Sequence, residues 1–298
     1  METRKFAIRN ILIPYDFSET AALALEHAVF MAKLCKAQIS LLHVIETYSF
    51  TSAISHAFSK SQSEFESKIE ESTKVKLQEI ADAIHKKSAI QVKFTTEVGS
   101  IYKQIVKVAH DIHANIIIMG THGASGFQEF LMGSNAFRVV TSSPCPVITV
   151  QSHAKKIGFK DIVLPIDDSI VSRQKIVYAV ELAKHYSSTI HIAGLRVAKN
   201  ADFVRKFEIK VRQVEDYCKE HNVLCTKKMF DGDDIAKMSL AYSDDINADL
   251  IIIMTEQEAN PGFFNMGSAA QSLVNHSKVP VMSIRPLATD PSKITISY

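Results

Sequence analysis

The chain has 298 residues, 46% hydrophobic and 22% charged, which is typical of a soluble globular protein with one large domain or two ordinary ones. Its 34 basic and 32 acidic residues leave a net charge of +2 without a basic run, so we expect no nucleic-acid partner. No apolar stretch reaches 18 residues, so we expect no membrane span. Four scattered cysteines without a C-x2-C pair favour free thiols and a cytoplasmic location.

The first half of the chain alternates apolar runs with helical patterns. Residues 11–15 predict a first strand, and Ser18 is placed to cap the helix that follows. That helix has one apolar face, made of Ala24, Ala28, Met31, Ala32 and Cys35. Later elements are predicted in the order strand 38–45, helix 61–87, strand 90–98, a short helix to about 112, strand 116–119 and strand 147–150. This alternation predicts parallel strands with right-handed crossovers.

The second half repeats this pattern. Residues 10–18 align with 161–169 at an offset of 151, residues 116–119 with 251–254 at an offset of 135, and Gly133 with Gly267 at an offset of 134. Chance similarity between apolar strands would not preserve the order and spacing of several segments. The sequence therefore predicts two α/β domains, residues 1–152 and 153–298, with a polar linker at 153–158. The tail after Arg285 is expected to be partly ordered.

A glycine motif follows the apolar run 116–119. It reads Gly120-Thr-His-Gly123, then nine residues, then Gly133-Ser134-Asn135 at the start of a helical pattern. Glycines let another backbone or a ligand approach closely, and amides at a helix start attract anions. The motif therefore indicates either a phosphate site or a strand–loop–helix connection that needs glycine. It is neither a P-loop nor a dinucleotide fingerprint, because both of those spacings are absent.

The spacing G-x2-G-x9-G-S and the text around it resemble the nucleotide-binding motif of the universal stress protein family. Residues 10–19 resemble that family's first strand and loop, and residues 40–45 its second strand. The resemblance implies two open, doubly wound five-stranded parallel sheets flanked by helices, each with strand order 3-2-1-4-5. That order places strands one and four side by side, so Asp16 and Gly120 should line one crevice.

The resemblance also implies that the first half binds an adenine nucleotide, ATP, accompanied by Mg²⁺. Asp16 would accept hydrogen bonds from the ribose or adenine, and Val44 would contact adenine through its backbone. The Ser134 hydroxyl would meet a phosphate oxygen or the magnesium ion. The full set of expected contacts is Pro14, Tyr15, Asp16, Val44, Met119, Gly120, Gly123, Gly133, Ser134 and Asn135. For Asp16 a plain turn residue, and for Val44 plain core packing, are the alternatives.

Other candidates carry less weight. His122 is interpreted as a solvated loop residue that could point at phosphates, and no catalytic residue is assigned. His110 and His113 provide at most half a metal site, so no protein metal site is expected. In the second half Asp167 matches Asp16, and Gly267-Ser268 matches Gly133-Ser134. The alignment at offset 135, however, puts Thr255 and Glu258 in place of the first two glycines. A carboxylate there would repel phosphate, so we expect a scaffold or a different ligand site.

Three functions remain open from the sequence. The first is a regulatory or stress-protective protein that binds ATP in its N-terminal half. The second is a weak ATPase or self-phosphorylating enzyme, which the absence of a motif lysine makes less favoured than binding. The third is a nucleotide-free structural module. Residues 146–150 and 280–284 are equivalent apolar strands that need cover. Members of the family commonly pair through their fifth strands, so the resemblance implies that these two strands pair the halves within one chain. Two chains would then associate as a homodimer.

Overall fold

The computed structural model describes residues 6–46, 55–122, 132–197, 200–256 and 266–286, with the backbone alone for 55–66 and 201. Gly123, Glu258 and the tail from 287 lie outside the described residues. Within the described parts of the chain, no helix has the length and apolar character needed to cross a membrane.

The first half follows the predicted strand–helix order. Its elements are β1 (Asn10–Pro14), α1 (Glu19–Cys35), β2 (Gln38–Ile45), α2 (Ser55–Ser88), β3 (Val92–Val98), α3 (Ile101–Asp111), β4 (Ile116–Gly120), α4 (Ser134–Ser142) and β5 (Val147–Val150). Ser18 caps α1 as predicted, because its Oγ accepts a hydrogen bond from the Ala21 N–H at 3.2 Å. The apolar face of α1 is buried against the sheet, which holds the start of α1 beside the end of β4.

The second half has the same order with one local change. Its elements are β6 (Asp161–Ile166), the 3-10 helix η1 (Ser172–Lys175), α5 (Ile176–Tyr186), β7 (Thr189–Arg196), α6 (Ala201–Glu220), β8 (Leu224–Asp231), α7 (Ile235–Asp245), β9 (Leu250–Met254), α8 (Ser268–His276) and β10 (Val281–Ile284). The change lies after β6, where η1 replaces the first turns that α1 has after β1.

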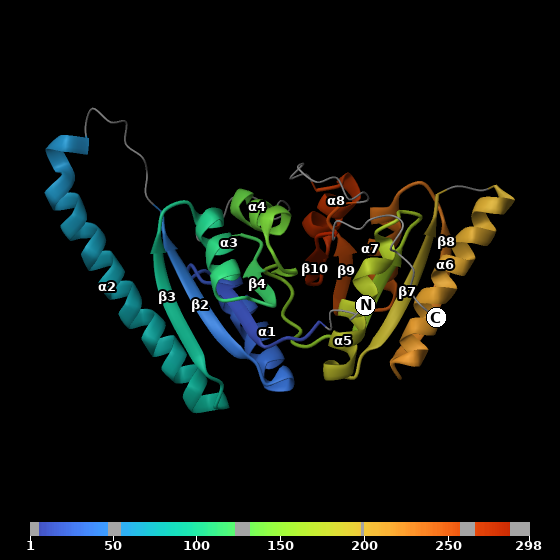
Figure 1. Ribbon diagram of the computed structural model, residues 1–298, viewed down its shortest axis with the longest axis horizontal. Coiled ribbons are helices and arrows are strands. Elements are labelled where there is room, and N and C mark those ends of the chain that lie inside the picture. Colours follow the sequence, from blue (N-terminus) through green and yellow to red (C-terminus); the bar gives the residue numbers. More distant parts are fainter. Residues whose placement is uncertain (1–5, 47–54, 123–131, 198–199, 257–265, 287–298) are drawn as a thin grey trace.

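The two predicted sheets are joined into one ten-stranded sheet, in the order β3-β2-β1-β4-β5-β10-β9-β6-β7-β8. Each half keeps the order 3-2-1-4-5 with parallel neighbours, and the halves meet through the antiparallel pair β5–β10 (Figure 1). Ile148 lies opposite Met282, its own equivalent, which is the register that a two-fold relation between the halves produces. The predicted pairing of the fifth strands within one chain is therefore present.

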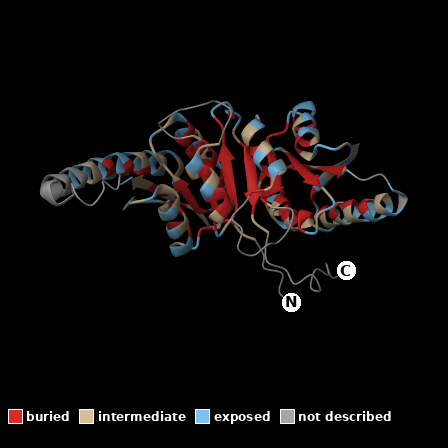
Figure 2. Cartoon of the chain, turned by 90° about the horizontal axis from the view of Figure 1, so that it is seen from above, coloured by how far each residue is buried: buried red, intermediate tan, exposed pale blue. Residues whose placement is uncertain are grey.

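Both faces of the sheet are covered by helices, and each core runs through both halves. One core lies under α1, α2, α5 and α6, and the other under α3, α4, α7 and α8. Figure 2 shows the strands as the most buried layer, with the exposed sides of the helices facing outward. The central strands β5 and β10 are buried along their whole length. The junction between the halves is thus continuous hydrophobic core, stabilised like the interior of a single domain.

The linker between the halves is packed rather than extended into solvent. Ala154 is buried, and its carbonyl oxygen accepts a hydrogen bond at 3.2 Å from the Nε2 of the buried His27 on α1. His27 also stacks on Phe159 at 5.5 Å between ring centroids. Burial lowers the pKa of His27, so the imidazole is neutral in this setting.

The strand pairing corrects one part of the predicted repeat. Ile11 pairs with Ile116 in the first half, and its equivalent Ile162 pairs with Leu250 in the second. Ile116 therefore corresponds to Leu250, so the offset is 134 along this strand and the predicted 135 is wrong. Both runs are rich in isoleucine, so letters alone could not fix the register. The backbone hydrogen bonds between strands fix it.

This correction changes which residues replace the glycine motif. Gly120 corresponds to Met254, and Thr121 corresponds to Thr255. The hydrogen bonds agree, because the Gly133 N–H donates to the Thr121 oxygen and the Gly267 N–H donates to the Thr255 oxygen. No residue is lost between strand and helix, so the expected replacement of Gly120 by Thr255 is wrong. The same spacing aligns Gly123 with Gln257 in the sequence, so the expected replacement by Glu258 is wrong as well.

Candidate functional site

A cavity of about 390 Å³ opens where β1 and β4 end side by side. This is the position at which the winding direction of such a sheet reverses and where ligands commonly bind. Nine of the ten residues predicted from the sequence line it, namely Pro14, Tyr15, Asp16, Val44, Met119, Gly120, Gly133, Ser134 and Asn135. The tenth, Gly123, lies outside the described residues. The volume falls within the range of small-molecule sites, about 300–1,000 Å³.

The end of β1 is held in place by backbone and side-chain hydrogen bonds. The Tyr15 N–H donates to the Leu42 oxygen at 2.8 Å, and the Tyr15 oxygen accepts from His43 Nδ1 at 2.7 Å. Asp16 Oδ1 accepts from the N–H of Ser18 at 3.1 Å and from its hydroxyl at 2.5 Å. Burial, and then the Asp16 carboxylate, raise the pKa of Tyr15, so its phenol stays neutral. Asp16 is thus a carboxylate fixed at the cavity wall.

Gly120 is required by packing against α1. A Cβ at this position would lie 2.6 Å from Thr20 Oγ1 and 2.8 Å from Thr20 Cβ. Thr20 Oγ1 in turn donates a hydrogen bond to the His122 oxygen at 2.5 Å. The glycine therefore lets the first turn of α1 and the loop after β4 meet at the cavity.

Gly133 is explained by close packing against another backbone segment, which is one of the uses expected of these glycines. Its φ is −58°, an ordinary value, so a strained backbone does not explain the glycine. A Cβ here would lie 3.2 Å from the Thr121 oxygen, to which the Gly133 N–H donates at 2.9 Å. Close approach between these two segments is what selects the small residue.

The start of α4 offers backbone donors to the cavity. Gly133 is its N-cap and provides no side-chain hydrogen bond, and the first bond within the helix runs from the Phe137 N–H to the Gly133 oxygen. The N–H groups of Ser134, Asn135 and Ala136 precede that bond, as in every helix start. Together with the helix dipole they favour an anion at this end of the cavity.

His122 is not the solvated loop residue that the sequence suggested. It lines the cavity, and its Nδ1 lies 3.0 Å from Thr121 Oγ1. Its Nε2 is buried, and among the described residues it has no hydrogen-bond partner. Its place between the strand end and the second glycine was the signal that could have assigned it to the site.

The remaining walls are apolar on one side and acidic on the other. The apolar lining consists of Pro14, Ala21, Leu42, Val44, Ile101, Ile105, Met119 and Ala136. Asp16 and Glu46 are the charged lining residues, and the described lining contains no lysine or arginine. The cavity is thus lined by apolar side chains, by the Asp16 carboxylate and by the start of α4.

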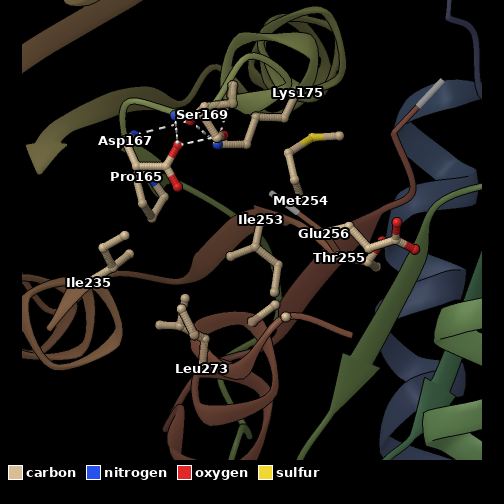
Figure 3. A pocket seen from close by; sticks show the side chains of 14 residues that line it. Pro165, Asp167, Ser169, Lys175, Ile235, Ile253, Met254, Thr255, Glu256 and Leu273 are labelled. Atoms are coloured by element: carbon tan, nitrogen blue, oxygen red, sulfur yellow. Dashed lines mark hydrogen bonds between the residues drawn. The ribbon is translucent and has the colours of Figure 1, made fainter. Parts of the chain in front are cut away.

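The equivalent place in the second half is nearly filled (Figure 3). Its cavity measures about 40 Å³ and is lined by Asp167, Ser169, Lys175 and Met254 among others. Asp167 Oδ1 accepts from the N–H of Ser169 at 3.1 Å and from its hydroxyl at 2.7 Å, the same turn that Asp16 makes. The turn is therefore kept although the space beside it is lost.

Two substitutions fill that space. Met254 stands where the first half has Gly120, and Lys175 stands where it has Ala24. The ammonium of Lys175 is buried and donates to the oxygen and the hydroxyl of Ser172 at 2.8 and 3.1 Å. Lys175 is the last residue of the 3-10 helix η1, which stands where the first half has the early turns of α1.

Lys175 and Asp167 also compensate each other electrostatically. Burial lowers the pKa of Lys175 to about 8, and the Asp167 carboxylate opposes that shift. For Asp167, burial pushes the pKa upward, but the Lys175 charge and hydrogen bonds from Ser169 and Ser172 outweigh it and lower the pKa. In this half the Lys175 ammonium thus supplies the positive charge that faces the Asp167 carboxylate.

A sequence model of the universal stress protein family matches residues 7–151 and again residues 158–285. The chain belongs to the universal stress protein family. The two matches mean that it carries two family domains in tandem, as the resemblance implied.

Relatives agree with this assignment. The universal stress protein MJ0577 of Methanocaldococcus jannaschii is 32% identical over 154 residues, which cover 48% of this chain and 94% of that protein. A putative universal stress protein of Staphylococcus aureus is 28% identical over 154 residues, covering 51% and 89%. Among solved structures, a universal stress protein from Archaeoglobus fulgidus aligns with a TM-score of 0.72 at 22% identity, over 94% of this chain and 97% of that one. That likeness shows the two-domain fold.

Sequence reasoning missed several lining residues of the N-terminal universal stress protein domain. Glu46 follows β2, and Ile101 and Ile105 lie on the first turns of α3. Their positions in the sequence could have indicated them, because each follows the carboxyl end of a strand or lies at the start of the next helix. Such strand ends line the cavity. Their side-chain directions, however, depend on the packing of α3 over β2.

Proposed function

We propose that the N-terminal universal stress protein domain binds an adenine nucleotide, ATP, and that the protein acts through nucleotide-dependent conformation or partner binding. The observation that carries this proposal is the cavity in which Asp16 and the uncapped start of α4 face one ligand-sized space. The carboxylate suits ribose hydroxyls, the wall around Val44 and Ile101 suits a flat base, and the amides of Ser134 and Asn135 suit phosphates.

Mg²⁺ would accompany the phosphates. Asp16 and Glu46 are the charged residues of the described lining, so the protein itself adds negative charge near an anionic ligand. Magnesium prefers oxygen ligands and is commonly held by one or two carboxylates together with substrate phosphates. The Ser134 hydroxyl offers an oxygen ligand that fits this ion, which would supply charge neutralisation.

The same lining favours binding over efficient turnover. Enzymes that transfer phosphoryl groups use lysine, arginine or metal to neutralise developing charge and a further residue to position the nucleophile. Lysine and arginine are absent from the described lining. The buried Nε2 of His122 is the observation that supports weak hydrolysis or self-phosphorylation as a second candidate.

The C-terminal domain is proposed to serve as a scaffold without an ATP site. Lys175 and Met254 fill its counterpart cavity to about 40 Å³, too small for a nucleotide. We propose a cytoplasmic location, which the four free thiols favour. Association of two chains into a homodimer stays a prediction.

Calorimetric titration with ATP and Mg²⁺ tests this proposal. The expected result is about one nucleotide per chain, with affinity strongly reduced in Asp16→Ala and retained in Asp167→Ala. The two aspartates make the same turn with the following serine, so the second variant controls for loss of that turn. Two equal sites per chain, or equal sensitivity to both substitutions, would contradict the asymmetry.

A further inference from the structure

One hydrogen bond reaches from the second half of the chain to the residue directly before Gly133 in the cavity lining of the first. The Met132 N–H donates to Asn275 Oδ1 at 3.0 Å, although the two residues are 143 positions apart. Met132 directly precedes Gly133, the N-cap of α4, and Asn275 lies in the last turn of α8. Figure 1 shows α4 and α8 on the same side of the sheet, flanking the junction of the halves.

This contact completes the anchoring of the start of α4. The next amide, Gly133 N–H, donates to the Thr121 oxygen at 2.9 Å. Two successive amides are therefore held by fixed acceptors, one from each half. Because the donors of Ser134 and Asn135 follow directly, the position of this anchored dipeptide sets the direction in which they point.

The acceptor is itself on a rigid support. Asn275 lies on α8, which leads directly into β10, and β10 pairs with β5 of the first half along the buried junction. Asn275 thus lies on a helix that is fixed against the first half, and not on a loop.

The contact runs in one direction only. At the offset of 134, Thr141 occupies the position in α4 that Asn275 occupies in α8. The Thr141 hydroxyl donates to its own helix, to the Phe137 oxygen at 3.0 Å and the Arg138 oxygen at 3.2 Å. Within the described part of the chain it makes no hydrogen bond to Met266, the counterpart of Met132. The half with the open cavity receives the cross-half bond, and the half with the filled cavity does not.

We propose that Asn275 is a positioning residue for phosphate binding in the N-terminal domain, so that this site is complete only when the second domain is present. The inference rests on the proposed ATP site. Asn275 acts through the backbone of Met132 and Gly133, and it needs no contact with the ligand. Preorganised donors bind an anion without the cost of ordering them at the moment of binding.

The test compares ATP with adenosine, because adenosine lacks the phosphates that this contact positions. In Asn275→Ala, ATP affinity should fall roughly three- to tenfold, the size of one lost hydrogen bond, while adenosine affinity changes less than about twofold. Asn275→Thr should behave like Asn275→Ala, since Thr141 shows that a threonine here bonds to its own helix. Unchanged thermal unfolding of both variants would show that the fold is intact.

Gln151→Ala is the matched control, because it removes another hydrogen bond between the halves without touching Met132. It should leave the ratio of ATP to adenosine affinity unchanged. Equal weakening of both ligands in Asn275→Ala, no weakening of ATP, or the same selective loss in Gln151→Ala would overturn the inference while leaving the ATP site in place. A wild-type chain that binds neither ligand would overturn the proposed function, and the inference with it.

Discussion

Replacing Gly120 with alanine should damage both the fold and the site. The added Cβ would lie 2.6 Å from Thr20 Oγ1, 2.8 Å from Thr20 Cβ and 3.1 Å from the Thr20 carbonyl carbon. Because two of these atoms are backbone or next to it, rotation of the side chain alone cannot relieve the clash. Thr20 would move and weaken its hydrogen bond to the His122 oxygen. Overpacking costs about 1–3 kcal/mol and a lost hydrogen bond about 1 kcal/mol, so we expect destabilisation of roughly 2–4 kcal/mol.

Thermal unfolding and ATP titration measure the two consequences. The expected drop in the unfolding midpoint is roughly 5–10 °C. ATP affinity should also fall, because Thr20 holds the backbone of His122, which lines the cavity. Gly267→Ala is the control, since its Cβ would meet only the Thr255 oxygen at an ordinary 3.7 Å. If Gly120→Ala unfolds at the same temperature as Gly267→Ala, the close approach of α1 to β4 is not what requires the glycine.

Four further outcomes are expected. Gly133→Val should weaken ATP binding in a folded protein, whereas Gly267→Val should not, because only the former crowds a neighbouring carbonyl, at 3.2 Å; equal affinities would contradict this. Chelation of Mg²⁺ should weaken ATP far more than adenosine, which equal losses would refute. Ile148→Lys places a charge in the buried junction, so amide hydrogen exchange should become faster in β5 and β10 before it does so in other strands. An equal increase in exchange rate across all strands would argue against an effect at the junction. The pKa of Lys175 is lower in the folded chain than in the unfolded chain, so between about pH 8 and 10 the unfolded chain binds more protons. The free energy of unfolding of the wild type should therefore rise with pH relative to that of Lys175→Met. Parallel pH dependences of the two free energies would contradict this.

Most of the fold was accessible from the sequence because local patterns and the repeat agree. Ser18 predicted the start of α1, and the apolar face from Ala24 to Cys35 predicted which side of α1 packs on the sheet. The pairing of β5 with β10 was predicted from the family resemblance together with two equivalent apolar strands that each need cover. The register of β9 did not follow, because an isoleucine-rich run slides by one residue without changing its hydrophobic pattern.

The candidate site was predictable where it depends on the motif and not where it depends on tertiary contacts. Asp16, Val44 and Ser134 line one cavity because strand ends meet at the switch of winding direction. Nothing near Asn275 in the sequence indicates that it bonds to Met132, since that contact exists only after the halves have joined. Filling of the second cavity by Lys175 likewise depends on how the helix after β6 begins.

The central claim is that the N-terminal domain holds ATP, and native mass spectrometry of the purified chain tests it most directly. After addition of ATP and Mg²⁺, the account predicts one bound nucleotide per chain, recovered as ATP when the protein is denatured. The same treatment of Asp16→Ala should leave the chain largely without nucleotide. A wild-type chain that retains no nucleotide, or that retains two, would contradict the account.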